Sequence, residues 1–362
     1  MDNGYESINI HLNEELSVTQ NENCHFSSYK FYITTLILII FIMTFNIVNK
    51  DKIKNELKEE MKDELKINFE SNFLSNLKRY IKKDALKTKI GLCVIGKKEN
   101  KYAKEFVEYY KSIGFNHIFI YDNNDKEGEN FEEVLSEDIS KNFVSINNYR
   151  SYRGEKDQPQ FEAYIDCYEK NSKNYEWLAF YDFDEFLYLK NYKTIQEFLE
   201  EEKFNNCSNI KINWMMYGDN DLIYYENIPV QERFKFPASP QCYRNTFIKS
   251  LIRGNLPTNY WSNMKNPHTS DNDYICCLAS GEKTDSRNYF NKPPNYDEAY
   301  IKHYATKSLE EYIDKGKRGR SDLKVVFNEE YWKNKFIYYF DINNKTKEKL
   351  DYIKNTLQID IN

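Results

Sequence analysis

The chain has no excess of basic residues, no Cys-x-x-Cys pair and, between residues 50 and 82, no glycine or proline. Among its 362 residues, 51 Lys and Arg stand against 57 Asp and Glu, a formal net charge of -6. Proteins that bind the phosphate backbone need a basic face, so nucleic acid is not expected as a partner. Without a Cys-x-x-Cys pair, neither a zinc site nor a thioredoxin-like motif is expected, although some of the seven cysteines can pair in an oxidising lumen.

The first 88 residues divide into three predicted segments. Residues 1–30 are polar and aperiodic, which predicts a disordered tail. Residues 31–49 contain an uncharged apolar run long enough to cross a bilayer, with no small-residue cleavage site after it. This favours a single-pass membrane anchor over a signal peptide or a buried core helix. Apolar residues that recur every four positions predict a helical stem over residues 50–88.

The orientation of the predicted anchor stays open. Several lysines follow the apolar run, whereas only Lys30 closely precedes it, and the positive-inside rule then keeps the C-terminal side in the cytoplasm. The activity inferred below instead favours a domain that faces the lumen of the Golgi or secretory pathway.

Strands and helices alternate from residue 89 onwards, which defines one predicted domain over residues 89–362. Strands are predicted at 90–95, 117–121, 143–146, 176–181, 210–214, 228–234 and 247–252. Helices are predicted at 103–113, 160–169, 194–202, 308–316 and 345–357. The alternation over the first hundred residues of this domain predicts βαβ units and a mainly parallel sheet.

Two aspartates follow the apolar run Trp177 to Tyr181. Because alternate residues of an extended chain point the same way, Asp182 and Asp184 are expected to present their carboxylates on one side. Carboxylates at the end of a strand suit Mg2+ or Mn2+ bound to a substrate diphosphate. Asp122 also follows a predicted strand, so in a parallel sheet Asp122 and Asp182 lie at the same ligand-binding edge.

An ordered series of motifs extends over about residues 89–322. It comprises KKEN at 97–100, GFNHIFIYDNN from 114, Gln160, Cys167 and Trp177 before DFDEF, INW at 212–214, YG at 217–218, QERF at 231–234, KSLIR at 249–253, PH at 267–268 and HY at 303–304. This series resembles the glycosyltransferase family 92 group and its bacterial and viral relatives. Lys98, Phe106 and the acidic run 219–221 depart from the group's pattern, so donor and acceptor are not carried over.

The resemblance implies an α/β fold of the GT-A type, in which a Rossmann-like mixed sheet is flanked by helices. It also implies a metal-dependent, inverting hexosyltransferase that moves a sugar from a UDP-sugar to a hydroxyl of a glycan or glycoprotein acceptor. Galactose is the sugar of the group's best-known example. The implied cofactor is Mn2+ or Mg2+, bound by Asp182, Asp184 and His303.

The resemblance also suggests which residues contact the donor and the acceptor. The donor contacts are Lys97, Glu99, Asp122, Gln160 and Lys307. Inversion requires a carboxylate that takes the acceptor proton. The candidates for this base are Asp219, Asp221 and Glu232, with no choice among them.

Two other functions compete with this interpretation. Phosphohydrolases of the HAD type also place Asp-x-Asp after an apolar strand, but near the start of the fold and before a Thr-containing turn, whereas three predicted strands precede Asp182 and Glu185 follows Asp184. The other is a non-catalytic, membrane-anchored scaffold that binds sugar nucleotides or glycans. Turnover of a sugar nucleotide distinguishes the scaffold from an enzyme.

Overall fold

The computed structural model describes residues 34–40, 88–152, 159–257, 268–269, 274–285, 287–319 and 327–361. The chain divides into two compact units, Met1–Ala85 and Leu86–Asn362. The predicted tail, the ends of the predicted anchor and residues 50–87 of the predicted stem lie outside the described residues. Residues 34–40 are helical, and no helix in the described ranges is long and apolar enough to span a membrane.

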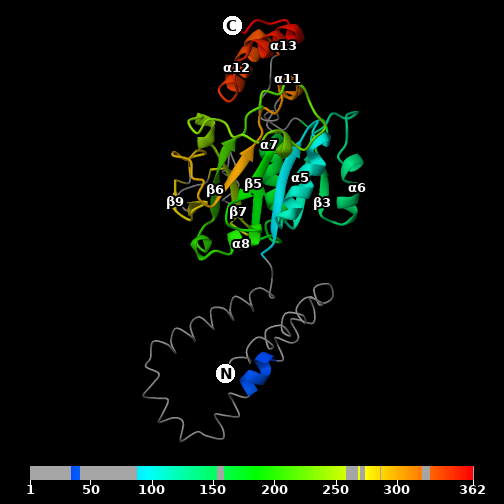
Figure 1. The fold of residues 1–362 in the computed structure, drawn as a ribbon. Helices are drawn as coiled ribbons and strands as arrows, with labels where there is room; N and C mark the ends of the chain where they lie inside the picture. The colour runs from blue at the N-terminus through cyan, green and yellow to red at the C-terminus, as the bar shows by residue number, and fades with distance from the viewer. Residues whose placement is uncertain are drawn as a thin grey trace, which may run out of the picture. The chain divides into compact units, whose positions relative to one another are not determined.

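The second unit is a mixed α/β domain built on one large sheet (Figure 1). Four strands form its parallel half, in the order β3 (Val144–Asn148), β2 (His117–Asp122), β1 (Ile90–Gly96) and β4 (Trp177–Phe180). The other half continues with β7 (Ile248–Arg253), β6 (Asn209–Met216), β10 (Ala299–His303) and β5 (Glu185–Leu189). The pairs β4–β7, β7–β6 and β10–β5 are antiparallel, which makes the sheet mixed as expected.

The register aligns the ends of the parallel strands. Gly96 pairs with Asp122, and Cys93 pairs with Phe180 two residues before Asp182. The prediction that Asp122 and Asp182 lie at one edge of a parallel sheet is therefore confirmed.

Helices cover this sheet through apolar faces. The first of them, α5 (Asn100–Ser112), buries Phe106 and Tyr110 against the aromatic core. The others that were predicted are α7 (Pro159–Asn171), α8 (Ile195–Leu199), α11 (Leu309–Arg318) and α13 (Lys347–Leu357). α11 begins with a capping box between Ser308 and Glu311, a strong helix-start signal.

Several elements were not predicted. They are α6 (Glu132–Ser140), α12 (Glu329–Phe340), β5, β10 and the short ribbon β8 (Cys276–Leu278) with β9 (Lys283–Thr284). β5 and β10 alternate apolar and polar residues only weakly, and they pair mainly with each other and with β6. α12 and α13 share an aromatic cluster with α11 and lie beside it (Figure 1).

The strand predicted at 228–234 is wrong, because this segment forms the short helix α9 (Val230–Arg233). The carboxylate of Glu105 accepts hydrogen bonds from the backbone N–H groups of Val230 (2.7 Å) and Gln231 (3.1 Å). These are the unpaired donors that open a helix, and a carboxylate from another element satisfies them. No pattern of neighbouring residues predicts a contact between segments so far apart in the sequence.

Candidate donor site

The two central aspartates lie in a turn, not in a strand. β4 ends at Phe180, and Glu185 N donates to the carbonyl of Asp182 (3.0 Å) while the Asp182 N–H donates to the Glu185 carboxylate (3.0 Å). Between the two aspartates, the buried Phe183 ring stacks on Phe131 at a centroid distance of 5.2 Å. The expectation that the two aspartates continue an extended strand is wrong, since the Glu185 cap and the Phe183 anchor turn the chain.

Three side chains from two elements hold the Asp182 carboxylate. Lys249 of β7 lies 2.8 Å from it, and Gln160 and Tyr164 of α7 donate to it at 2.8 and 3.1 Å. Burial raises the pKa of Asp182, but the Lys249 ammonium outweighs it and leaves that pKa lowered. Gln160, predicted as a donor contact, thus contacts Asp182 directly.

Lys249 also contacts Glu185. Its Nζ lies 3.2 Å from the Glu185 carboxylate, which is fully buried. Burial lowers the pKa of Lys249, but Asp182 and Glu185 raise it well above its usual value. Burial raises the pKa of Glu185 well above its usual range. One ammonium thus holds both ends of the turn together.

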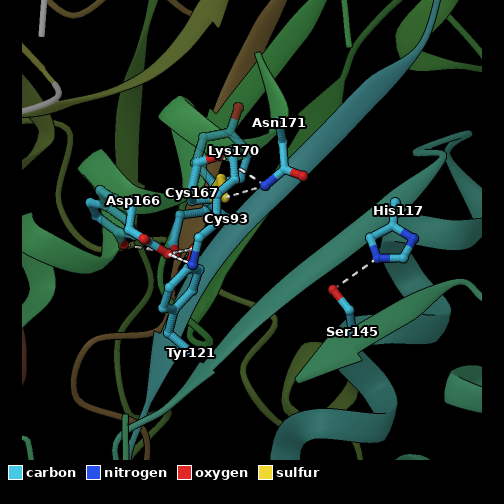
Figure 2. The surroundings of a disulfide bond; sticks show 10 residues. Cys93, His117, Tyr121, Ser145, Asp166, Cys167, Lys170 and Asn171 are labelled. Carbon is cyan, nitrogen blue, oxygen red and sulfur yellow. Dashed lines mark hydrogen bonds and ion pairs between the residues drawn. A yellow bond between two sulfur atoms is a disulfide. The ribbon is translucent and has the colours of Figure 1, made fainter. Parts of the chain in front are cut away.

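A disulfide attaches α7 to the sheet beneath these contacts. Cys167 of α7 is bonded to Cys93 of β1, and beside it Tyr121 of β2 donates to Asp166 at 2.7 Å (Figure 2). A second disulfide joins Cys207 to Cys277. Because α7 carries Gln160 and Tyr164, the first disulfide supports the side chains that hold Asp182.

Asp184 is 4% exposed and lies among two lysines and a histidine. Lys315 of α11 donates to its carboxylate, Lys307 lies at 3.9 Å and the His303 Nε2 at 3.6 Å. Burial raises the pKa of Asp184, but Lys315, Lys307 and His303 together hold it well below its usual value. The predicted pair of Asp184 and His303 is therefore close in space. Burial lowers the pKa of His303, which keeps the imidazole neutral near pH 7.

A cleft of about 480 Å³ opens beside Asp184. Its lining is charged and comes from the loops after β1 and β2, the first turn of α5, the loop before α11 and α11 itself. Six basic residues line it, Lys98, Lys101, Lys307, Lys315, Lys317 and Arg318, together with five acidic ones, Glu99, Asp125, Glu129, Glu311 and Asp314, and with Tyr102, Asn124 and Gly128. Basic side chains around a cleft at the carboxyl ends of parallel strands suit a phosphate-bearing ligand. Of the predicted donor contacts, Glu99 and Lys307 line this cleft.

The remaining predicted donor contacts organise the cleft's loops. Asp122 is 2% exposed, accepts from Asn124 N–H at 2.9 Å and pairs with Arg150 at 2.8 Å. Arg150 in turn donates to three carbonyls of the loop 125–128. Lys97 pairs with Asp125 at 2.6 Å. Direct donor binding by Asp122 and Lys97 stays a prediction.

The three predicted bases differ in their surroundings. Asp219 is 2% exposed and its carboxylate binds Tyr339 of α12 and Lys349 of α13, the latter at 2.7 Å. Asp221 pairs with the same Lys349 at 2.8 Å. Glu232 is exposed on α9, and its neighbour Arg233 pairs with Glu311 instead. The catalytic base therefore stays a prediction for all three.

Sequence reasoning missed Lys249, Tyr164 and Lys315. A lysine inside the otherwise apolar strand predicted at 247–252 was the available signal for Lys249, because a buried lysine needs a carboxylate partner. Lys315 lies on the polar side of α11, where only the packing of that helix beside the turn distinguishes it from a solvated lysine.

The donor set of Asp182, Asp184 and His303 fits a hard divalent cation in its chemistry. Two carboxylates and a neutral imidazole are ligands that Mn2+ accepts, and the His303 Nδ1 is buried with no hydrogen-bond partner among the described residues. In the same part of the chain, no three His, Cys, Asp or Glu side chains are arranged closely enough to form a metal cluster. Lysines neutralise both aspartates, so a cation would have to displace Lys315.

Comparison with known proteins identifies the family of this domain. The model of glycosyltransferase family 92 matches residues 89–359. The chain belongs to glycosyltransferase family 92. The family is one of glycosyltransferases, and the match extends beyond the motifs at residues 89–322 to include α12 and α13.

Two plant family 92 proteins are similar to parts of the chain. A protein of Oryza sativa subsp. japonica is 30% identical over 108 residues, which cover 30% of this chain and 18% of that protein. One of Ricinus communis is 23% identical over 172 residues, which cover 43% and 30%. The chain thus spans less than a third of these relatives' length.

Solved structures of S. aureus TarS are also similar to the chain. Residues 1–349 of TarS match with 10% identity and a TM-score of 0.33, covering 74% of this chain and 73% of that one. The same TarS fragment in complex with UDP-GlcNAc matches with 11% identity and a TM-score of 0.34, covering 75% and 73%.

Proposed function

We propose that this family 92 member is an inverting glycosyltransferase of the GT-A type, which transfers a hexose from a UDP-sugar to a hydroxyl of a glycan or glycoprotein. The main observation is the cleft beside Asp184, which basic side chains of α11 and of the loop after β1 help to line. The parallel order β3-β2-β1-β4 places this cleft at the edge where nucleotides bind in open α/β sheets. Galactose remains the first sugar to test.

Lys315 and Lys307 are the side chains that we assign to the diphosphate. Both line the cleft and both neutralise Asp184. As the glycosidic bond breaks, negative charge collects on the leaving diphosphate, and fixed ammonium groups nearby stabilise that charge. Burial lowers the pKa of Lys307, and the carboxylates of Asp184 and Glu99 oppose this effect.

Mn2+ or Mg2+ is proposed as the cofactor, with Asp182, Asp184 and His303 as its ligands. When bound, such an ion supplies positive charge next to the leaving diphosphate. Lysines near the aspartates keep them ionised in the absence of the ion, since they hold the pKa values of Asp182 and Asp184 below their usual range. Ionised carboxylates are the form that binds a cation.

Of the three candidate bases, we retain Glu232 first. Asp219 and Asp221 both contact Lys349, whereas Glu232 is exposed and lies next to Arg233, which pairs with Glu311 of α11. An exposed carboxylate can take the proton of an acceptor hydroxyl and release it to water.

The proposed location is a membrane, through a single-pass anchor, with the domain facing the lumen of the Golgi or secretory pathway. The disulfides Cys93–Cys167 and Cys207–Cys277 support this side, because disulfides persist in oxidising compartments and are rare in the cytosol. The lysines that follow the predicted anchor favour the opposite orientation, with the C-terminal side in the cytoplasm.

The test is release of nucleoside diphosphate by the full chain from UDP-galactose, UDP-glucose, UDP-GlcNAc and GDP-mannose, with and without Mn2+. We expect Mn2+-dependent release from one donor, and its loss in Asp184→Asn. The matched control is Asp351→Asn, which removes an exposed Asp–Lys pair on α13 that is not part of the cleft lining. A folded protein that neither binds nor hydrolyses any of these donors would support the scaffold instead.

A further inference from the structure

Five aromatic side chains form a continuous run that starts at His303. The Trp214 ring of β6 lies 4.2 Å from the His303 ring, and Phe247 stacks on Trp214 at 5.4 Å. Tyr243 and Tyr289 meet Phe247 at 5.8 and 5.9 Å. Phe290 follows Tyr289 at 5.5 Å. Trp214, Phe247, Tyr243, Tyr289 and Phe290 are called the aromatic run below.

The inner end of the run adjoins the candidate donor site. His303, against which Trp214 packs, lies 3.6 Å from the Asp184 carboxylate. The indole Nε1 of Trp214 is buried and has no hydrogen-bond partner in the part of the chain that the structure describes. A buried indole N–H usually finds a partner, and an unmade bond costs free energy. A ligand hydroxyl that reached the indole N–H would accept the missing hydrogen bond.

The outer end of the run is exposed. Tyr243, Tyr289 and Phe290 are 60%, 48% and 39% exposed, and they are connected through Phe247. Contiguous exposed aromatic rings mark a binding surface more often than an inert one. Tyrosine combines a flat apolar face with a hydroxyl at little cost in conformational entropy, which suits ligands with both apolar and hydroxylated faces.

The arginine in the turn at the outer end of the run is already paired within the protein. The one charged residue of the 3-10 turn Tyr243–Thr246 is Arg244. Its guanidinium lies over the Tyr338 ring at 4.5 Å and 3.9 Å from the Asp341 carboxylate. Arg244 therefore points its charge toward α12, and although Lys292 is exposed two residues after Phe290, Arg287 is also paired, with Asp285 at 3.5 Å. This favours an uncharged ligand over a phosphorylated or acidic one.

We infer that the aromatic run is the acceptor subsite and binds a neutral oligosaccharide, with its reacting sugar at the Trp214 end and the preceding sugars on Tyr243 and Tyr289. The inference rests on the proposed glycosyltransferase function and names its acceptor class. The successive ring steps of 4.2, 5.4 and 5.8 Å from His303 to Tyr243 extend beyond a single sugar ring. An acceptor of two or more sugars is therefore expected to bind more tightly than a monosaccharide.

The experiment follows the indole N–H resonances of the full chain, labelled with 15N-tryptophan, in a detergent without a sugar headgroup. The four tryptophans give four resonances, of which Trp214→Phe assigns one. The probes are lactose, N-acetyllactosamine, mannobiose and chitobiose, each compared with its monosaccharide. We expect at least one disaccharide to shift the Trp214 resonance saturably, while that of Trp332, which packs among α11 and α12, stays in place.

Two variants test whether the disaccharide that shifts the Trp214 resonance binds to the aromatic run. Tyr243→Ala is expected to weaken the disaccharide's binding about fivefold, as for the loss of one aromatic contact. The control Tyr224→Ala removes a tyrosine that is 61% exposed but packs on Tyr352 of α13, and it should leave the affinity unchanged.

UDP binding, measured on the same samples, separates the two proposals. If UDP binds but no disaccharide moves Trp214, or if Tyr243→Ala and Tyr224→Ala behave alike, the acceptor subsite is refuted and the donor site stands. If neither UDP nor any disaccharide binds, both proposals fall. A change in sedimentation of Tyr243→Ala, without a change in glycan affinity, identifies a self-association surface and also refutes the subsite.

Discussion

Two buried aspartates in this domain have the same immediate chemistry and different surroundings. Asp184 follows β4 and Asp219 follows β6, and each pairs with the ammonium group of a lysine. The partners of Asp184 line a cleft, whereas those of Asp219 belong to α12 and α13, which pack as an aromatic cluster with α11. A buried Asp–Lys pair therefore does not mark a functional site by itself; access to a ligand-sized space does.

The lysines that pair with these two aspartates, Lys349 and Lys315, also differ in role. Lys349 is 1% exposed and holds two carboxylates, so it acts as a tether for α13. Lys315 has a side chain that is 29% exposed, which leaves it able to exchange Asp184 for a ligand. The same residue type thus fixes structure in one place and offers charge to a ligand in the other.

The largest expected effect concerns Asp184. Asp184→Asn keeps the size of the side chain but removes the charge, and we expect donor turnover to fall by about 100-fold or more, as when a group that stabilises transition-state charge is lost. The urea midpoint should also fall, because buried Lys307 loses its counterion even though Lys315 can turn to water, so turnover is compared per folded protein. A loss of turnover that merely follows a loss of folded protein would contradict this assignment.

The two disulfides are expected to stabilise the fold equally but to differ in their effect on turnover. Replacing Cys93 and Cys167, or Cys207 and Cys277, by alanine removes a cross-link over 74 or 70 residues. Each double variant should lose about 4 kcal/mol of unfolding free energy. Only the first should also lower turnover of the remaining folded protein, because it frees α7 with Gln160 and Tyr164. Equal turnover in both variants would disprove the link between α7 and Asp182.

Asp219→Asn should act on stability. It leaves Lys349 buried with only the exposed Asp221 as counterion, so the free energy of unfolding should fall by about 3 kcal/mol. Asp221→Asn is the control, with an expected loss below about 1 kcal/mol, because Asp221 is 59% exposed on its side chain. Urea unfolding followed by tryptophan fluorescence measures both. A selective loss of turnover in Asp219→Asn would instead make it the base.

The smallest expected effect is a pH dependence through Glu311, which binds Arg233 at 2.6 Å and Tyr102 at 2.6 Å. Burial raises the pKa of Glu311, but Arg233, Tyr102 and Ser308 lower it to about 2 from 4.5. The stabilisation is present above pH 4.5 and is lost as the pH falls toward 2, with about 2 kcal/mol gone at pH 3. In Glu311→Gln the difference in unfolding free energy between pH 5 and pH 3 should be smaller by this amount.

The predictions that succeeded rest on local patterns. The apolar runs of β1, β2 and β4 and the helical faces of α5 and α7 are encoded within a few residues, as are the capping signals of α11. Parallel pairing followed from the alternation of strands and helices, and it placed Asp122 and Asp182 at one edge. The motif series was sufficient to name the family that the match over residues 89–359 shows.

The predictions that failed concern contacts between distant segments. α9 was mistaken for a strand because its N-terminal donors are satisfied by Glu105, more than a hundred residues earlier. The turn at Asp182 and Asp184 depends on the Phe183–Phe131 stack, and its charge balance depends on Lys249 and Lys315. None of these partners has a fixed spacing from the aspartates, so no local pattern encodes them.

The sequence by itself determined that this chain carries a family 92 domain with an Asp-x-Asp motif at the end of a buried strand, because strand periodicity and motif order are properties of neighbouring residues. Only the tertiary structure decided which aspartate borders a cleft, which one anchors the C-terminal helices, and which cysteines pair. The physical reason is that burial and ion pairing depend on the packing of α7, α11 and α13 against the sheet, and that packing joins residues far apart in the chain.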